Sequence, residues 1–342
     1  MTQDIRNLSL KELGDYLKSI GEKPFRAKQI FAWIYKNNAE NFDAMSNLSA
    51  DLKKKLMADF SFASPLIASQ QISSDGTMKI LFEFNDKERV ETVLIPTATR
   101  ATVCVSSQAG CKFGCRFCAS GLGGWTRHLT CAEILTQILY MKKNSKRHPL
   151  SHIVFMGTGE NFDNYDNLMK AIRIINAKEG LNIGARRITI STVGIIPKIK
   201  QLTQERIQVE LAISLHGYND KSRNQLMPVN RKYPFTDLIA ACKEYIKATK
   251  RQVTFEYILI KDLTCSDEAA KELGRHLRGM ICKMNLIPYN SVKEFLHRTP
   301  THDEMETFQN RLKAYGIHAT IRTPRGRDIS GACGQLRHSI KN

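Results

Sequence analysis

The segment Cys111-Lys112-Phe113-Gly114-Cys115-Arg116-Phe117-Cys118 contains three cysteines in the spacing Cys-x3-Cys-x2-Cys. Glycines at Gly110 and Gly114 allow a tight loop in which all three sulfur atoms can turn inward around one metal centre. A structural zinc site normally takes four protein ligands, and so does an iron-sulfur cluster that only transfers electrons. Three cysteines therefore indicate a cluster with one open iron, on which a bound ligand can react.

This spacing resembles the cluster loop of the radical S-adenosylmethionine (SAM) superfamily, in which the open iron binds the amino and carboxylate groups of SAM. Two other interpretations stay open. A zinc site could take its fourth ligand from Cys104, Cys131 or His128. Disulfides are the other possibility, but nine cysteines without a signal peptide are typical of a reducing compartment, where clustered thiols more often bind metal.

The composition indicates a basic protein with an anionic partner. The chain has 342 residues, enough for one large domain or about two, and 51 basic against 33 acidic residues give a net charge of +18. No apolar run approaches the ~18 residues of a membrane span, so we expect nucleic acid rather than a membrane. The polar opening Met1-Thr2-Gln3-Asp4 predicts no targeting segment and therefore a cytoplasmic protein.

Residues 1–65 are predicted to form a helical accessory domain that binds RNA. Ser9 and Glu12 have the spacing of a capping box, an apolar stripe with helical period follows them, and Gly21 ends that helix. A second helix is expected after Pro24. Charged residues on such a helix often only solvate its surface, but here they could also form a basic face. The cations concerned are Arg26, Lys28 and Lys36.

The pattern changes to a period of two over residues 66–97. Apolar residues alternate with others after an Asp75-Gly76 turn, and a second such run extends from Val90 to Ile95. This predicts a short antiparallel extension that links the helical part to the main domain. Glu91 lies between two apolar positions of the second run, where a glutamate usually faces solvent.

Residues 98–342 are predicted to form the main domain, because strand and helix patterns alternate along them. Such alternation requires a parallel sheet covered by helices with right-handed crossovers. We expect an α/β fold with a partial (β/α)6 barrel; a doubly wound open sheet is less favoured because no Gly-x-Gly-x-x-Gly follows the first strand. The predicted strands are Ala101 to Ser107, His152 to Gly159, Arg187 to Gly194, Val209 to His216, Val253 to Ile260, Lys283 to Asn290 and His318 to Thr323.

Polar residues follow several of these strands, and the carboxyl ends of parallel strands are where ligands bind in β/α folds. The second strand ends in Gly157-Thr158-Gly159-Glu160, where glycines permit close backbone approach and a carboxylate can accept from an ammonium group. Similar positions hold Ser191, Ser214-Leu215-His216 and Asn290. Each is also an ordinary turn residue, but together they could form a cofactor pocket facing the cysteine loop.

Several motifs taken together resemble the RlmN family of dual-specificity RNA methyltransferases, which has the Cfr antibiotic-resistance enzymes as close relatives. The likeness extends over essentially the whole chain. The motifs are the run from Cys104 to Cys111, Gly159-Glu160, Ser214-Leu215-His216, Met227-Pro228-Val229-Asn230, Asn285-Leu286-Ile287-Pro288-Tyr289-Asn290 and Ala332-Cys333-Gly334-Gln335-Leu336.

The resemblance implies methylation of C2 of an adenine in 23S ribosomal RNA (rRNA) and in certain transfer RNAs (tRNAs). It implies that Cys333 carries the methyl group, that Glu91 is the proton acceptor and that Cys104 is the resolving thiol. It also implies an external reductant such as flavodoxin or ferredoxin, no membrane association and a monomer. Cys111, Cys115 and Cys118 would hold a 4Fe-4S cluster, and SAM would bind at Gly159, Glu160, Ser191, Ser214, Leu215, His216 and Asn290.

The chemistry of C2 explains why such residues are needed. This carbon is electron-poor and cannot attack the methyl group of SAM as an ordinary nucleophile. One SAM would methylate the Cys333 thiolate, and a second would yield a radical that removes hydrogen from the new S-methyl group. The carbon radical would add to C2 and tie RNA to Cys333. Removal of the C2 proton by Glu91 and attack by Cys104 on the Cys333 sulfur would release product and leave a disulfide.

Two alternatives accompany this interpretation. A Cfr-like enzyme that methylates C8 of the same adenine would use the same cysteines, whereas an RNA-binding cluster protein without catalysis would have no use for Cys333. The chain also departs from the usual family pattern at Thr158 and Asn161 after the second strand and at Ser330-Gly331 before Cys333. These changes bear on pocket shape and on the choice between C2 and C8. The other four cysteines, Cys131, Cys242, Cys265 and Cys282, are assigned to packing or to the surface.

Overall fold

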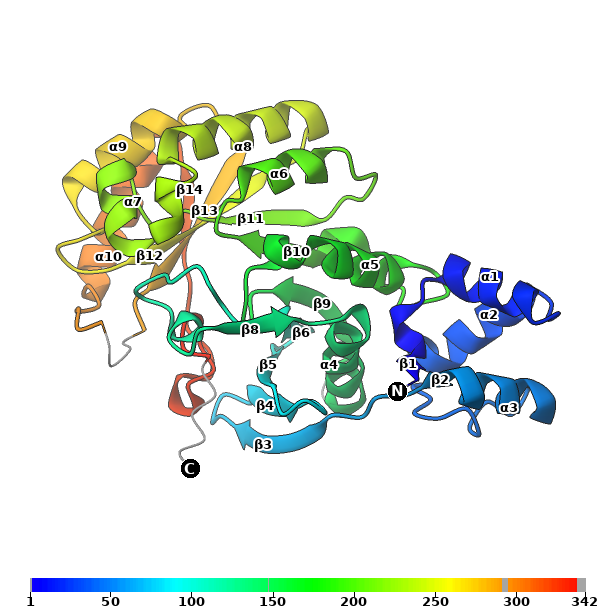
Figure 1. Cartoon of the computed structure of the whole chain (residues 1–342). Helices are drawn as coiled ribbons and strands as arrows, with labels where there is room; N and C mark the ends of the chain where they lie inside the picture. The colour runs from blue at the N-terminus through cyan, green and yellow to red at the C-terminus, as the bar shows by residue number, and fades with distance from the viewer. Residues whose placement is uncertain (1, 147, 291–294, 337–342) are drawn as a thin grey trace.

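A computed structural model describes residues 2–146, 148–290 and 295–336 of the chain. The amino-terminal part is a small unit of helices closed by a two-stranded parallel pair, which lies at one end of the molecule beside α4 and α5 (Figure 1). Its elements are β1 (Gln3–Asp4), α1 (Leu10–Ser19), α2 (Phe25–Phe31), the π-helical turn η2 (Ala32–Lys36), α3 (Ala50–Asp59) and β2 (Phe60–Ser61).

Local sequence signals explain the first helix of this unit. The Ser9 hydroxyl accepts from the Glu12 N–H at 3.2 Å, and the Glu12 carboxylate accepts from the Ser9 N–H at 2.7 Å, as the predicted capping box requires. Gly21 follows the helix with a φ of +80°, a conformation that glycine adopts without strain. Leu13 and Leu17 are fully buried and belong to the same apolar cluster as the core of the main domain.

The main sheet has ten strands within the described residues, in the order β14-β13-β12-β11-β10-β9-β6-β5-β4-β3. Seven of them run parallel to one another, so six βα units are followed by a last parallel strand. These are β6 (Ala101–Cys104), β9 (Leu150–Phe155), β10 (Ile188–Thr192), β11 (Glu210–Ser214), β12 (Val253–Leu259), β13 (Cys282–Pro288) and β14 (His318–Ile321).

Helices cover the outer face of this curved sheet (Figure 1). They are α4 (Cys131–Asn144), α5 (Tyr165–Asn176), α6 (Ile196–Thr203), α7 (Asp220–Leu226), α8 (Phe235–Thr249), α9 (Asp267–Leu277) and α10 (His302–Ala314). A small antiparallel pair, β7 (Gln108–Gly110) with β8 (Trp125–His128), brackets the cysteine loop. Along the described residues, no helix combines the length and the apolar character needed to cross a bilayer.

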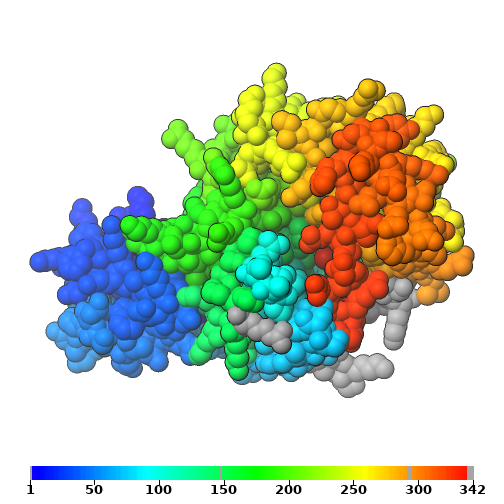
Figure 2. Space-filling view, turned by 180° about the vertical axis from the view of Figure 1, so that it is seen from behind, coloured from blue at the N-terminus to red at the C-terminus, as the bar shows by residue number. Residues whose placement is uncertain are grey.

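The predicted antiparallel extension is continuous with the parallel sheet. It consists of β3 (Leu66–Ile72), β4 (Met78–Glu83) and β5 (Arg89–Pro96), and β5 pairs antiparallel with β6. The carboxyl-terminal segment, red in both views, crosses the surface beside these strands (Figures 1 and 2). One sheet edge and the last described segment of the chain therefore meet at one face.

Strand alternation divides the residues of β4 to β6 between two faces. Residues such as Ile80, Val90 and Val103 are buried in the main apolar core. On the opposite face, the β5–β6 register places Val93 directly across from Cys104, and both pack against Leu336 of the carboxyl-terminal segment. This second face is the one that adjoins the candidate site.

The α/β fold with a partial barrel, a helical amino-terminal part and an antiparallel extension is confirmed. The domain boundaries at residues 65 and 97 stay a prediction, and residues 337–342 of the predicted main domain lie outside the described part. α3 and the β1–β2 pair were not predicted individually, since α3 has only two buried apolar residues, Leu52 and Leu56.

Candidate active site

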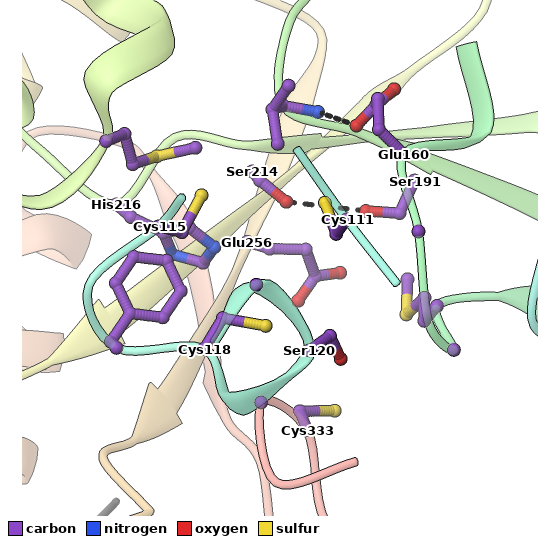
Figure 3. Close-up of a pocket in the computed structure, with 18 of the residues that line it drawn as sticks. Cys111, Cys115, Cys118, Ser120, Glu160, Ser191, Ser214, His216, Glu256 and Cys333 are labelled. Carbon is purple, nitrogen blue, oxygen red and sulfur yellow. Dashed lines mark hydrogen bonds between the residues drawn. The ribbon is translucent and has the colours of Figure 1, made fainter. Parts of the chain in front are cut away.

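A cavity enclosing about 940 Å³, counting its open mouth, lies at the carboxyl ends of the parallel strands. Its wall is formed by the cysteine loop, by residues that follow β9, β10 and β11, and by the Cys333 segment (Figure 3). Cys111, Cys115, Cys118 and Cys333 therefore line one space, although the chain separates the last from the others by more than half its length.

Backbone contacts fix the cysteine loop. Gly110 has a φ of +76°, and a Cβ added there would overlap the Gly124 carbonyl, so the close approach of the two segments requires glycine. The Cys111 N–H donates to that carbonyl at 2.8 Å. The Cys118 N–H donates to the Cys115 carbonyl at 3.0 Å, which closes the turn between the second and third cysteines.

The three loop thiols fit a cationic centre. Burial raises the pKa of Cys111 to about 12 and raises the pKa of Cys115 well above its ordinary value. Repulsion from Cys118 and Cys111 adds to the effect at Cys115, because the three sulfur atoms are close enough to interact. Thiolates are the ligand form, so a site of this kind needs a metal centre to become fully ionised. An iron-sulfur cluster supplies such positive charge.

The zinc interpretation does not find its fourth ligand at this cavity. Cys131 is buried in the apolar core at the start of α4, and His128 shares a hydrogen bond with the Gln108 amide at 3.0 Å. Cys104 is buried on the β6 face outside the cavity wall. The cysteine loop lines the cavity without these additional donors.

Gly159 and Glu160 place a carboxylate at the end of β9. Gly159 has a φ of +107°, and a Cβ there would lie 2.6 Å from the Gln108 Cβ, so the position requires glycine. The Glu160 carboxylate accepts from the N–H groups of Val193 at 2.7 Å and Phe162 at 3.0 Å. Burial nevertheless raises its pKa to about 7, which makes a cationic ligand group a favourable neighbour.

The predicted cofactor residues after β10 and β11 differ in their positions. The Ser191 and Ser214 hydroxyls line the cavity 3.4 Å apart, whereas Leu215 is buried outside its wall. His216 lines the cavity with a φ of +48°, and its Nδ1 accepts from the Ile258 N–H at 3.1 Å. Burial lowers the pKa of His216 to about 3, so the ring is neutral at ordinary pH.

The Cys333 segment is attached to both the cysteine loop and β13. The Ala119 N–H donates to the Gly334 carbonyl at 2.7 Å, directly after the third loop cysteine. The Asn290 side chain lies outside the cavity wall, and its amide donates to the Cys333 carbonyl at 3.2 Å. Cys333 is exposed along the cavity, but the atoms packed around its thiol raise the pKa to about 11.

Cys104 and Glu91 lie on the neighbouring face of β5 and β6. Burial, together with proximity to Cys333, raises the pKa of the Cys104 thiol. The sequence pattern favoured a solvent-facing Glu91, and that expectation is wrong because the residue is only 4% exposed. Its Oε1 forms an ion pair with Lys79 at 3.0 Å. The carboxyl-terminal segment packs on this face and covers it.

The chain matches two family models: the ribosomal RNA large subunit methyltransferase N-terminal domain over residues 3–61, and the radical SAM superfamily over residues 105–273. It is 46% identical over 338 residues to a probable dual-specificity RNA methyltransferase RlmN from Clostridium perfringens, covering 98% of this chain and 97% of that protein. The chain belongs to the RlmN family. The predicted resemblance is thereby confirmed.

Two further comparisons agree with this assignment. A probable dual-specificity RNA methyltransferase RlmN from Geobacillus kaustophilus is 45% identical over 335 residues, covering 97% of this chain and 92% of that protein. A radical SAM methyltransferase from Sphaerobacter thermophilus has a crystal structure that matches with a TM-score of 0.94 and 44% identity. That match covers 98% of this chain and 99% of the other.

Arg223 of α7 is a residue that sequence reasoning missed in this RlmN chain. It is fully buried, and its guanidinium donates to the Val193 carbonyl at 2.6 Å and to the Leu215 carbonyl at 3.1 Å. A third bond at 2.8 Å joins it to the Asn230 side chain in the motif that begins at Met227. Arg223 thus holds together the segments that follow β10 and β11. In the sequence, the nearby motif Met227-Pro228-Val229-Asn230 was the signal that could have pointed to this residue.

Two further residues shape the cavity without having been predicted as site residues. Glu256 of β12 lines the wall, and its Oε1 accepts from the Asn285 amide at 2.7 Å. Asn161 donates to the carbonyls of Phe155 at 2.7 Å and Ser191 at 2.8 Å. Its side chain therefore ties the ends of β9 and β10 to each other.

Proposed function

We propose that this protein methylates C2 of an adenine in 23S rRNA and in certain tRNAs, using two SAM molecules per turnover. The observation that supports this most strongly is the place of Cys333. It lines the same cavity as the three loop cysteines, while Cys104 and Glu91 lie on the adjoining sheet face. The reaction would need a methyl carrier, a radical source, a proton acceptor and a resolving thiol, all within reach of one RNA nucleobase.

Cys111, Cys115 and Cys118 would hold a 4Fe-4S cluster, and Glu160 would accept from the amino group of SAM. Ser191, Ser214 and His216 would complete that pocket from the wall, whereas Leu215 and Asn290 would act through the backbone that they support. When bound and reduced, cluster and SAM together supply a deoxyadenosyl radical. The remaining chemistry would be done by the protein's own side chains.

Cys333 would first take a methyl group as a thiolate, by displacement at a sulfonium. After one hydrogen atom is lost from that methyl group, the carbon would bond to C2 and tie the RNA to the Cys333 sulfur. This addition would leave one unpaired electron on the adenine ring, and the ring would lose that electron to the oxidised cluster that Cys111, Cys115 and Cys118 would hold. Glu91 would accept the C2 proton. The Cys104 thiolate would then attack the Cys333 sulfur, so that an S–S bond forms and the carbon–sulfur bond breaks with its electron pair going to the carbon.

Analysis of the methylated nucleoside tests the proposal. Purified protein, SAM, a reductant and an RNA fragment carrying the target adenine are incubated without oxygen, and the nucleosides are then separated by chromatography beside 2-methyladenosine and 8-methyladenosine standards. We expect 2-methyladenosine. A product methylated at C8 would instead support the Cfr-like alternative. If the protein binds RNA but leaves both SAM and RNA unchanged, the result would support the non-catalytic alternative.

RNA binding should weaken steeply as salt rises, because the chain carries a net charge of +18. Lys28 and Lys36 are exposed on the helical unit, whereas the Arg26 guanidinium donates to Gln29 and to the Asn47 carbonyl. We therefore expect charge reversal at Lys28 and Lys36 to lower the slope of log affinity against log salt by roughly 0.7 for each phosphate that the variant no longer neutralises.

Fluorescence anisotropy with a labelled RNA hairpin over a salt series measures that slope. A matched control is charge reversal at Lys271, an exposed lysine on α9 far along the chain from the helical unit. The proposal that the helical unit binds RNA would be wrong if all variants kept the same slope.

We further propose that the protein is a cytoplasmic monomer that receives electrons from flavodoxin or ferredoxin.

A further inference from the structure

Lys79 of β4 connects Glu91 to the segment that bears Cys333. Its ammonium lies 3.0 Å from Glu91 Oε1 and donates to the Ser330 carbonyl at 3.4 Å. In the β4–β5 ladder Lys79 lies opposite Val93 while Glu91 lies opposite Leu81, so the two charged side chains are diagonal neighbours on one face. One cation therefore contacts both the candidate base and a backbone group three residues before the methyl carrier.

This ion pair is unusual for the hairpin because it is buried. The Lys79 and Glu91 side chains are about 10% and 5% exposed, whereas Lys87, which pairs with Glu83 on the same hairpin, is 77% exposed. Burial removes hydration from both charges, and such a pair often gives no net stability compared with apolar residues of the same size. A stabilising role alone gives no reason for a lysine here.

Attachment of the carboxyl-terminal segment also does not depend on Lys79. Asp328 accepts from the Ser73 hydroxyl at 2.6 Å and from the Ser74 N–H at 3.1 Å. The Gly326 N–H donates to the Asp75 carboxylate at 3.1 Å. These contacts already fasten the segment to the turn between β3 and β4.

The two oxygens of the Glu91 carboxylate have different surroundings. Oε1 is held by Lys79, but Oε2 is buried and has no hydrogen-bond partner among the described residues. A buried acceptor without a partner destabilises the fold, and such atoms are rare in folded proteins unless they serve a function. Oε2 is therefore the atom that is free to take a proton.

We propose that Lys79 is a positioning residue for removal of the C2 proton. Its ammonium binds Oε1 of the Glu91 carboxylate and so orients Oε2, which is left free for the proton. In that step the C2–H bond breaks, its electron pair stays with the adenine ring and the proton binds Oε2. The proposal rests on the proposed function, because it requires Glu91 to be the base.

The test separates the steps of one turnover in the Lys79→Met variant. Methyl loading of Cys333 and formation of the RNA adduct should persist, since the cavity is untouched. Release of RNA from the adduct should slow roughly 10- to 100-fold. This is smaller than the whole rate contribution of a general base, which is ~10²–10⁴-fold, because Glu91 itself is still present. Adenine carrying deuterium at C2 should now release more slowly than ordinary adenine, because proton removal has become rate-limiting. Lys79→Arg should recover most of the rate.

Three comparisons decide the outcome. Lys87→Met removes the exposed ion pair of the same hairpin and should leave every step unchanged. Adding Lys79→Met to Glu91→Gln should slow release little further if Lys79 acts through Glu91. If Glu91→Gln traps the adduct while Lys79→Met releases RNA at the normal rate, the inference fails and the proposed base stands. If Glu91→Gln itself releases normally, the base assignment fails and Lys79 with it. Equal loss of methyl loading and release in Lys79→Met would also refute the inference.

Discussion

Replacing Cys104 by alanine is expected to leave RNA covalently attached to the protein at Cys333. In the proposed mechanism, methyl loading and addition to C2 do not need the Cys104 thiol, which lies outside the cavity wall. Release would need it, because in that mechanism the carbon–sulfur bond breaks only when a second thiolate attacks the Cys333 sulfur. Under single-turnover conditions the adduct should approach one RNA per protein chain, while free methylated RNA falls to background.

A denaturing gel with end-labelled RNA measures this adduct, and mass spectrometry of the peptide from 328 to 337 locates it. The Cys104→Ala/Cys333→Ala double variant should show no adduct. Cys242→Ala is a suitable control, since Cys242 is a fully buried cysteine of α8 that belongs to the apolar core. Normal release of product by Cys104→Ala would contradict the resolving role, and an adduct in the double variant would contradict the carrier role.

Replacing Cys115 by alanine is expected to abolish cluster binding and with it every radical step. The Cys115 thiol interacts with Cys111 and Cys118, so its removal leaves two thiols where three are needed. Anaerobically reconstituted Cys115→Ala should lose most of its iron and acid-labile sulfide, and cleavage of SAM should fall to background.

Cys265→Ser provides the matched control for this experiment. Cys265 is half-buried, lies outside the cavity wall and donates to the Glu304 carbonyl at 3.8 Å, a contact that a serine hydroxyl can replace. It should retain iron, sulfide and SAM cleavage. The cluster assignment would be refuted if the unaltered protein held tightly bound zinc without acid-labile sulfide, or if Cys115→Ala kept a full cluster.

Short-range patterns predicted most of the fold because local physics determines those features. The capping box at Ser9, the alternation along β4 and β5 and the strand-helix repeats all depend on neighbours a few residues apart. The strand ends that line the cavity followed from the general rule for parallel sheets. Gly159 and Glu160 were predicted in this way, and the structure places them on the wall.

Features made by distant parts of the chain could not be predicted in this way. Glu91 looked solvent-facing from its own strand, but a segment some 240 residues later covers that face. Lys79 contacts Ser330 across 251 positions, and Arg223 joins the ends of two strands from a helix. A charged residue between apolar positions of a strand gives no sign of burial until its partner is known. Such contacts depend on tertiary packing rather than on period or propensity.

The most direct test of the central claim follows a labelled methyl group through Cys333. Anaerobic protein is loaded with SAM carrying an isotopically labelled methyl group, freed of unbound SAM, and then given RNA with unlabelled SAM and reductant. We expect the label first on the peptide from 328 to 337 and afterwards on C2 of the target adenine, with the peptide losing it as RNA gains it. Labelled RNA formed by Cys333→Ala, or label that stays on the peptide while unlabelled methyl enters RNA, would contradict the account.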